Sequence, residues 1–181
     1  MAHETEMAFI SSVRDKFPQA FTNARVLEVG SLNINGSIRQ FFENCEYIGI
    51  DVAPGNSVDI VCQGQDFDDA DESYDMTVSC ECFEHNPYWV ETFLNMIRMT
   101  KPGGIVTVTC ATTGREEHGT SRTSPFASPL TISIGWEYYK NVAESDFKEF
   151  IDMDAHFSSY EFSIHEKGCD LYFWGVKHEN S

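Results

Sequence analysis

The clearest pattern in the sequence is an alternation of short apolar runs with amphipathic stretches. Residues 26–29 are an apolar run of strand length, and Gly30 and Gly36 then enclose a loop of small and polar residues. Residues 38–45 show helical spacing, and residues 47–51 form a second apolar run that ends in an acid. The pattern predicts a strand–helix–strand unit. The apolar positions of its helix are Ile38, Phe41, Phe42 and Cys45.

The same unit carries a candidate ligand site. Gly30 lies in the turn after the first strand, and Asp51 ends the second strand about 20 residues later. In doubly wound α/β folds, a glycine at this position lets the backbone approach a nucleoside, and the acid accepts hydrogen bonds from ribose hydroxyls. The sequence therefore predicts a nucleoside site at the carboxyl ends of these two strands.

The rest of the chain continues the alternation of predicted strands and helices. Pro18 ends an opening helix, and Pro87 suits the start of the helix that carries Val90, Phe93, Leu94 and Ile97. Between the fifth strand and residue 141 the pattern is irregular. The further predicted elements are an opening helix at residues 4–17, strands at 57–62, 73–80 and 105–110, a helix from 145, and a hairpin formed by 160–165 and 171–176.

These motifs resemble a known family. Glu28-x-Gly30 together with Asp51 resembles the first motif and the ribose acid of the class I S-adenosylmethionine-dependent methyltransferases. The residues 99–104, Met-Thr-Lys-Pro-Gly-Gly, resemble the segment that precedes the fifth strand in that family. The sequence departs from the family pattern in one respect. The family has three closely spaced glycines, whereas residues 31–35 here contain none. The resemblance covers roughly residues 26–110.

The resemblance implies an α/β fold, a doubly wound Rossmann-like sheet of seven strands. The sheet is expected to be mostly parallel with an antiparallel last strand, and helices are expected on both faces. Length and composition favour one domain over residues 1–181. Within it we expect an N-terminal helix in residues 1–24, a cofactor-binding half in residues 25–112, and a lid and closing hairpin in residues 113–181.

The resemblance also implies the cofactor, S-adenosyl-L-methionine, and its contacts. Asp66 and Phe67 occupy the place where the family contacts the adenine amino group and ring face, although the acidic loop that follows is also typical of a solvated surface. The residues expected to bind the cofactor are Glu28, Val29, Gly30, Ser31, Gly36, Asp51, Val52, Asp66, Phe67, Cys80 and Glu81.

Candidate catalytic residues follow the fourth strand. His85 and Glu81 are the candidates for proton transfer. Glu81-x-x-Glu84-His85 also resembles the Glu-x-x-Glu-His of metal-assisted O-methyltransferases, where these side chains converge on a divalent ion; the same residues line the pocket wall in metal-independent relatives. Metal binding, acid–base catalysis and a structural role all stay open. His118, in the irregular segment, is within reach of the site.

The irregular segment, residues 113–139, is predicted to be a mobile substrate lid. It is rich in Gly, Ser, Thr and Pro, and it follows the fifth strand beside the expected cofactor cleft. Trp136, Tyr138 and Tyr139 either close over the acceptor or pack on the last strands.

Charge and composition limit the partners. The formal net charge is −17, with only 12 Lys and Arg, which argues against nucleic acid as a substrate. The acidity favours solubility or attraction of a cationic substrate. No apolar run is long enough for a membrane span, so we expect a cytoplasmic protein, monomeric or homodimeric.

The leading functional hypothesis is methyl transfer to a small-molecule acceptor. An alternative is a catalytically inactive S-adenosylmethionine-binding regulatory or interaction module. A nicotinamide or nucleotide-sugar oxidoreductase is a third reading, opposed by the missing glycines. Transfer of a labelled methyl group separates the first two hypotheses.

Overall fold

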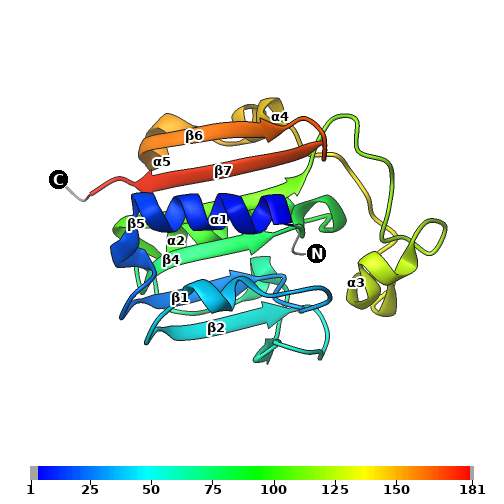
Figure 1. Ribbon diagram of the computed structural model, residues 1–181, viewed down its shortest axis with the longest axis horizontal. Helices are drawn as coiled ribbons and strands as arrows, with labels where there is room; N and C mark the ends of the chain where they lie inside the picture. Colours follow the sequence, from blue (N-terminus) through cyan, green and yellow to red (C-terminus); the bar gives the residue numbers. More distant parts are fainter. Residues whose placement is uncertain (1–3, 180–181) are drawn as a thin grey trace.

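The computed structural model describes residues 4–179 and is built on one seven-stranded sheet (Figure 1). The strand order is β3-β2-β1-β4-β5-β7-β6. Strand β7 runs antiparallel to both neighbours, and the other pairs are parallel. The predicted Rossmann-like architecture is confirmed. The strands are β1 (Arg25–Val29), β2 (Glu46–Asp51), β3 (Ile60–Val61), β4 (Tyr74–Cys80), β5 (Thr100–Ala111), β6 (Phe157–His165) and β7 (Asp170–Lys177).

Helices cover both faces of this sheet because the central strands are apolar on both sides. Val26 packs in one cluster with Ile10 and Val13 of α1, whereas the next residue, Leu27, belongs to a second cluster with Phe93 of α2. Figure 1 shows α1 and α2 on opposite sides of the strands. The α-helices are α1 (Glu4–Lys16), α2 (Trp89–Met99), α3 (Pro129–Ser133), α4 (Glu144–Phe150) and α5 (Met153–His156), and the 3-10 turns are η1 (Pro18–Ala20), η2 (Ile38–Phe41), η3 (Gly64–Asp66), η4 (Phe83–His85) and η5 (Pro125–Ala127).

The helix predicted between β1 and β2 is absent, and this prediction was wrong. Only the 3-10 turn η2 forms, and Phe42 beyond it is already extended. The chain there pairs with the segment before β1: the N–H of Glu43 donates to the carbonyl of Phe21 at 2.9 Å, and the ring of Phe42 stacks on that of Phe21 at 4.5 Å. Phe42 is thus covered in an extended conformation.

Two predicted strands have different bounds in the structure. Strand β3 is two residues long instead of six; just before it, the N–H of Asp59 donates to the carbonyl of Gly49 at 2.8 Å, and the side chain of Asp59 accepts from the N–H of Gly49 at 2.7 Å. Strand β5 begins at Thr100, earlier than predicted, so Lys101 to Gly104 belong to a strand with an irregular register against β4.

The hairpin β6–β7 and the helices before it close the second apolar cluster. Phe147 of α4 is fully buried and contacts Phe93 of α2 and Phe173 of β7 at ring-centroid distances of 5.1 and 6.2 Å. The carboxylate of Asp146 accepts from the N–H of Ala143 at 2.7 Å and so caps the start of α4. None of the helices formed by the described residues has the length and apolar character of a bilayer span.

Candidate active site

A pocket of about 640 Å³, open solvent included, lies at the carboxyl ends of β1, β2 and β4. Strands β1 and β4 are neighbours, but the chain leaves β1 toward β2 and reaches β4 only later, so this is where the strand order reverses. Open α/β sheets bind ligands at such switch points. The wall consists of Glu6, Glu28, Gly30, Ser31, Leu32, Ile34, Gly36, Ser37, Ile38, Asp51, Cys80, Glu81, Cys82, His85 and residues 127–131.

The turn after β1 forms the floor of the pocket. Gly30 has a φ of +81°, and its N–H donates to the carbonyl of Ile50 at 2.9 Å. A Cβ at this position would lie 2.7 Å from the Cβ and Sγ atoms of Cys82. Both the backbone conformation and the close approach therefore require glycine. A larger side chain would disturb the fold before it met a ligand.

Asp51 at the end of β2 holds the same loop from the other side. Its Oδ2 accepts from the N–H of Leu32 at 3.0 Å, and its Oδ1 accepts from the N–H of Val52 at 2.8 Å. Burial raises the pKa of Asp51 above its usual range, and the two backbone donors oppose this shift. The carboxylate remains on the pocket wall.

The pocket is acidic. Four of its lining residues carry carboxyl groups, namely Glu6, Glu28, Asp51 and Glu81, and no Lys or Arg is among the described residues that line it. Glu28 accepts a hydrogen bond from the hydroxyl of Tyr47 at 2.9 Å, and burial raises its pKa to about 8. A cation placed here would meet carboxyl groups, which it favours in the ionised form, and no like charge, so the pocket suits a positively charged ligand.

Glu81 follows β4 directly and has a left-handed backbone with φ of +49°. Its N–H donates to the carbonyl of Thr109 at 2.9 Å, which fixes this turn against β5. Burial and the neighbouring carboxylate of Glu84 raise the pKa of Glu81 above its usual range. Its Oε1 is buried without a hydrogen-bond partner in the structure. Backbone strain and a carboxylate oxygen without a partner at a pocket wall are typical of functional positions.

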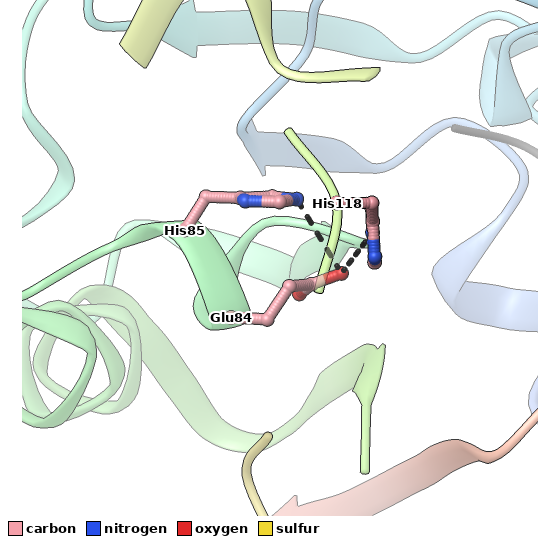
Figure 2. Close-up of side chains that lie close together, drawn as sticks. All are labelled: Glu84, His85 and His118. Carbon is pink, nitrogen blue, oxygen red and sulfur yellow. Dashed lines mark ion pairs between the residues drawn. The ribbon is translucent and has the colours of Figure 1, made fainter. Parts of the chain in front are cut away.

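His85 forms a cluster with the side chains of Glu84 and His118 (Figure 2). Glu84 and His85 belong to η4, and His118 comes from the segment after β5. The Nε2 atoms of both imidazoles lie 3.9 Å from Oε1 of Glu84. Burial raises the pKa of Glu84 above its usual range and lowers the pKa of His85 to about 3, so His85 is neutral near pH 7.

The segment after β5 supplies the remaining wall. It is less irregular than its sequence predicts, because η5 and α3 form within it and residues 127–131 line the pocket. Figure 1 shows α3 standing apart from the sheet beyond the ends of the strands. The ring of Tyr139 lies 5.6 Å from that of His85 and 5.0 Å from that of His118, and Trp136 lies 5.7 Å from Tyr88.

Sequence comparison identifies the central part of the chain. Residues 27–108 match the family model described as a methyltransferase domain. This matched segment, a little under half of the chain, is therefore similar to methyltransferase domains. A sequence search of curated proteins found no match.

Solved methyltransferase structures share the fold of this chain. Phosphoethanolamine N-methyltransferase 2 from Haemonchus contortus, solved with phosphomonomethylethanolamine and S-adenosylhomocysteine, is 15% identical with a TM-score of 0.68; 95% of this chain is covered, but only 52% of the nematode protein. The chain thus spans about half the length of that enzyme.

Two further methyltransferase structures are covered more fully. The 1,6-didemethyltoxoflavin-N1-methyltransferase of Burkholderia thailandensis is 14% identical, with a TM-score of 0.64 and coverage of 97% of this chain and 80% of that one. A Haloferax volcanii putative methyltransferase, solved in complex with the Trm112 activator, is 14% identical with a TM-score of 0.59, and covers 99% of this chain and 100% of that one.

Most residues predicted to bind the cofactor line this pocket. They are Glu28, Gly30, Ser31, Gly36, Asp51, Cys80 and Glu81, and the catalytic candidate His85 joins them. Val29, Val52, Asp66 and Phe67 are not part of its wall. Val29 is buried in the core, Asp66 is exposed, and the carbonyl of Phe67 accepts from Asn95 at 3.0 Å. An adenine contact by Asp66 and Phe67 stays a prediction.

Sequence reasoning missed several wall residues. Glu6 of α1 is 1% exposed and lines the pocket, yet in sequence it is one of several acids near the N-terminus. The sequence does place Glu6 on the same face of α1 as apolar Ile10 and Val13. Because acids are rarely buried, an acid on the apolar face of a helix indicates a specific role. Cys82 and residues 127–131 carried no comparable signal.

Proposed function

We propose that this methyltransferase domain transfers a methyl group from S-adenosyl-L-methionine to a small-molecule acceptor. The observation that carries the proposal is the acidic pocket at the switch point of the sheet. S-adenosylmethionine has a sulfonium and an ammonium group, and Glu28 and Glu6 provide carboxyl groups for these charges. Asp51, at the end of β2, is proposed to accept hydrogen bonds from the ribose hydroxyls.

The transfer itself requires little apparatus from the protein. The acceptor atom attacks the methyl carbon, the bond from carbon to sulfur breaks, and the sulfonium becomes a neutral thioether. The acceptor must also lose a proton. Glu81 is the better proton acceptor of the two catalytic candidates, because it has a raised pKa and an unpaired oxygen, whereas a pKa of about 3 makes His85 a weak base.

A small acceptor fits the surroundings of the pocket. The Haemonchus and Burkholderia structures hold phosphomonomethylethanolamine and 1,6-didemethyltoxoflavin, both small molecules. A net charge of −17 opposes binding of a polyanion such as nucleic acid. We propose that the acceptor enters on the side where residues 127–131 meet Glu81 and His85.

Calorimetric titration with S-adenosylmethionine and S-adenosylhomocysteine tests cofactor binding. Asp51→Ala is expected to weaken binding by at least ~10-fold, since hydrogen bonds to charged groups contribute ~1.5–3 kcal/mol. Exposed Asp68→Ala, in the acidic loop outside the pocket, is the matched control and should bind like the parent. Equal affinity of the Asp51 variant and the parent would remove Asp51 from the site.

Incubation with labelled S-adenosylmethionine and fractionated small metabolites then tests turnover. We expect labelled product with the parent and a large loss of rate with Glu81→Gln, at little changed cofactor affinity. Binding without transfer to any fraction would favour the alternative of an inactive cofactor-binding module.

A further inference from the structure

We propose that Glu84, His85 and His118 form a binding site for one divalent transition-metal ion, beside the cofactor pocket. The three side chains come from two separate segments, η4 after β4 and the loop after β5. Each offers one ligand atom, and these atoms lie within 4.8 Å of one another. Figure 2 shows the Glu84 carboxylate directed toward both imidazole rings.

The distances from Glu84 to the two histidines allow a single ion to be shared. Bonds from zinc to imidazole nitrogen and carboxylate oxygen measure about 2.0–2.2 Å, so two ligands of one ion can be up to ~4.0–4.4 Å apart. Oε1 of Glu84 lies 3.9 Å from Nε2 of His85 and 3.9 Å from Nε2 of His118. These separations are too long for hydrogen bonds and fall within the span of one bound ion.

The carboxylate of Glu84 provides the independent reason for a ligand. Its side chain is 0% exposed, and neither Oε1 nor Oε2 has a partner at normal hydrogen-bond geometry, although the backbone N–H groups of Glu84 and Ala111 also interact with the carboxylate. Buried polar atoms are normally paired, because an unpaired group loses its hydration without compensation. A bound cation would compensate both oxygens at once.

The identity of the donors indicates the class of metal. Two imidazoles and one carboxylate suit zinc, iron, cobalt or manganese, whereas magnesium and calcium prefer oxygen ligands alone. Nδ1 of His118 lies 3.1 Å from the carbonyl of Glu116, which favours a proton on Nδ1 and a lone pair on Nε2. That is the tautomer a metal ligand requires.

A glycine brings the two segments together. Gly119 has a φ of +64°, and a Cβ there would lie 2.5 Å from Cε1 of His85. Only a residue without a side chain lets the loop lie so close to His85, and this places the preceding residue, His118, opposite Glu84. The resulting set contains His118 and not Glu81, so it differs from the set that the sequence motif predicts.

Metal binding is measured without cofactor, so its failure is distinct from a failure of the methyl-transfer proposal. Protein treated with a chelator is titrated with Zn²⁺ and Co²⁺ by calorimetry, and Mg²⁺ serves as the comparison ion. We expect one equivalent of Zn²⁺ or Co²⁺, no comparable binding of Mg²⁺, and a visible Co²⁺ spectrum. A rise in melting temperature that a chelator reverses is expected from the same preference for the folded state.

Glu84→Gln and His118→Gln should each lower the affinity at least ~100-fold, since even residues that only orient ligands change it 10–100-fold. His156→Gln, on α5, is the matched control and should bind like the parent. Glu81→Gln should also bind the metal like the parent. If this variant lost metal affinity, the site would instead be the Glu81, Glu84 and His85 set of the sequence motif. Absence of stoichiometric binding by the folded parent, or equal affinity of all variants, would overturn the proposal. Circular dichroism confirms that each variant is folded.

Discussion

Glu28 links the stability of the fold to the charge of its ligand. The residue sits in β1 beneath the pocket, 5% exposed, and its pKa is raised by burial from 4.5 to about 8. Below pH 4.5 the carboxyl group is protonated in both the folded and the unfolded state. Between these two pKa values the unfolded chain loses the proton and the folded protein retains it. Stability therefore falls as the pH rises through this window.

Glu28→Gln should remove this pH dependence. Glutamine keeps an acceptor for the hydroxyl of Tyr47 but cannot ionise. We expect the variant to gain stability over the parent between pH 5 and pH 8, by a few kcal/mol, since one pKa unit corresponds to ~1.4 kcal/mol. Urea unfolding of both proteins at several pH values measures the difference in their free energies of unfolding. The other buried carboxyl groups are present in both proteins, so their contributions cancel in this difference.

If the difference in unfolding free energy between Glu28→Gln and the parent stayed constant from pH 5 to pH 8, Glu28 would already be ionised in the folded protein. Binding provides a second readout. A cationic ligand favours the ionised carboxylate, so the parent should bind S-adenosylmethionine more tightly as the pH rises toward 8 and should release protons on binding. The same residue would then destabilise the free protein and stabilise the complex.

At the residue scale, the sequence motif located the ligand site but not its boundaries. Glu28, Gly30 and Asp51 could be assigned to the ligand site because their spacing predicts a strand, a turn and a second strand. This prediction needs only the neighbouring sequence. Glu6 reaches this region from the opening helix through tertiary packing, and His118, expected from the sequence only to lie within reach of the site, is brought beside Glu84 and His85 from the loop after β5. No local pattern reports such a meeting.

At the scale of elements, the same contrast explains which predictions failed. The buried strands β4 and β5 were found because strands apolar on both faces stand out in sequence. The predicted helix at residues 38–45 was lost because its apolar residues are covered equally well by the 3-10 turn η2 and the extended segment after it. Phe42 stacks on Phe21, and Asn44 turns the chain into β2 with a φ of +53°. Helical spacing predicts amphipathicity, but neighbouring segments decide the conformation.

The segment with η5 and α3 is the element whose mobility we predict. Neither η5 nor α3 contains a buried residue, and Phe126 is 69% exposed, yet residues 127–131 line the pocket. Few apolar contacts imply a low free energy of local opening. Amides of α3 should exchange rapidly in the free protein and more slowly once S-adenosylhomocysteine is bound, because the ligand adds contacts to this wall.

Hydrogen exchange followed by mass spectrometry checks this prediction. Helix α4 is the internal control: it is also short, but its Phe147 is fully buried, so its amides should be protected with and without ligand. If α3 were protected in the free protein as strongly as α4, the segment would be ordinary packed structure and no lid.

At the scale of the whole molecule, charge is the dominant feature. A net charge of −17 makes the folded protein repel itself, and added salt screens this repulsion within ~10 Å at 0.1 M and ~3 Å at 1 M. Salt also weakens ion pairs such as Arg25–Glu46, which are separated by 3.1 Å at the surface. Exposed pairs contribute only ~0–1 kcal/mol each, so the relief of repulsion should outweigh their loss.

The melting temperature is therefore expected to rise by several degrees between low salt and 1 M sodium chloride at pH 7.5. The control is the same titration near pH 4.5, the isoelectric point, where the net charge vanishes and the electrostatic gain should vanish with it. An equal rise at both pH values would show that salt acts through exclusion from the protein surface, as it does for uncharged proteins. A fall at pH 7.5 would show instead that surface ion pairs stabilise this fold more than its net charge destabilises it.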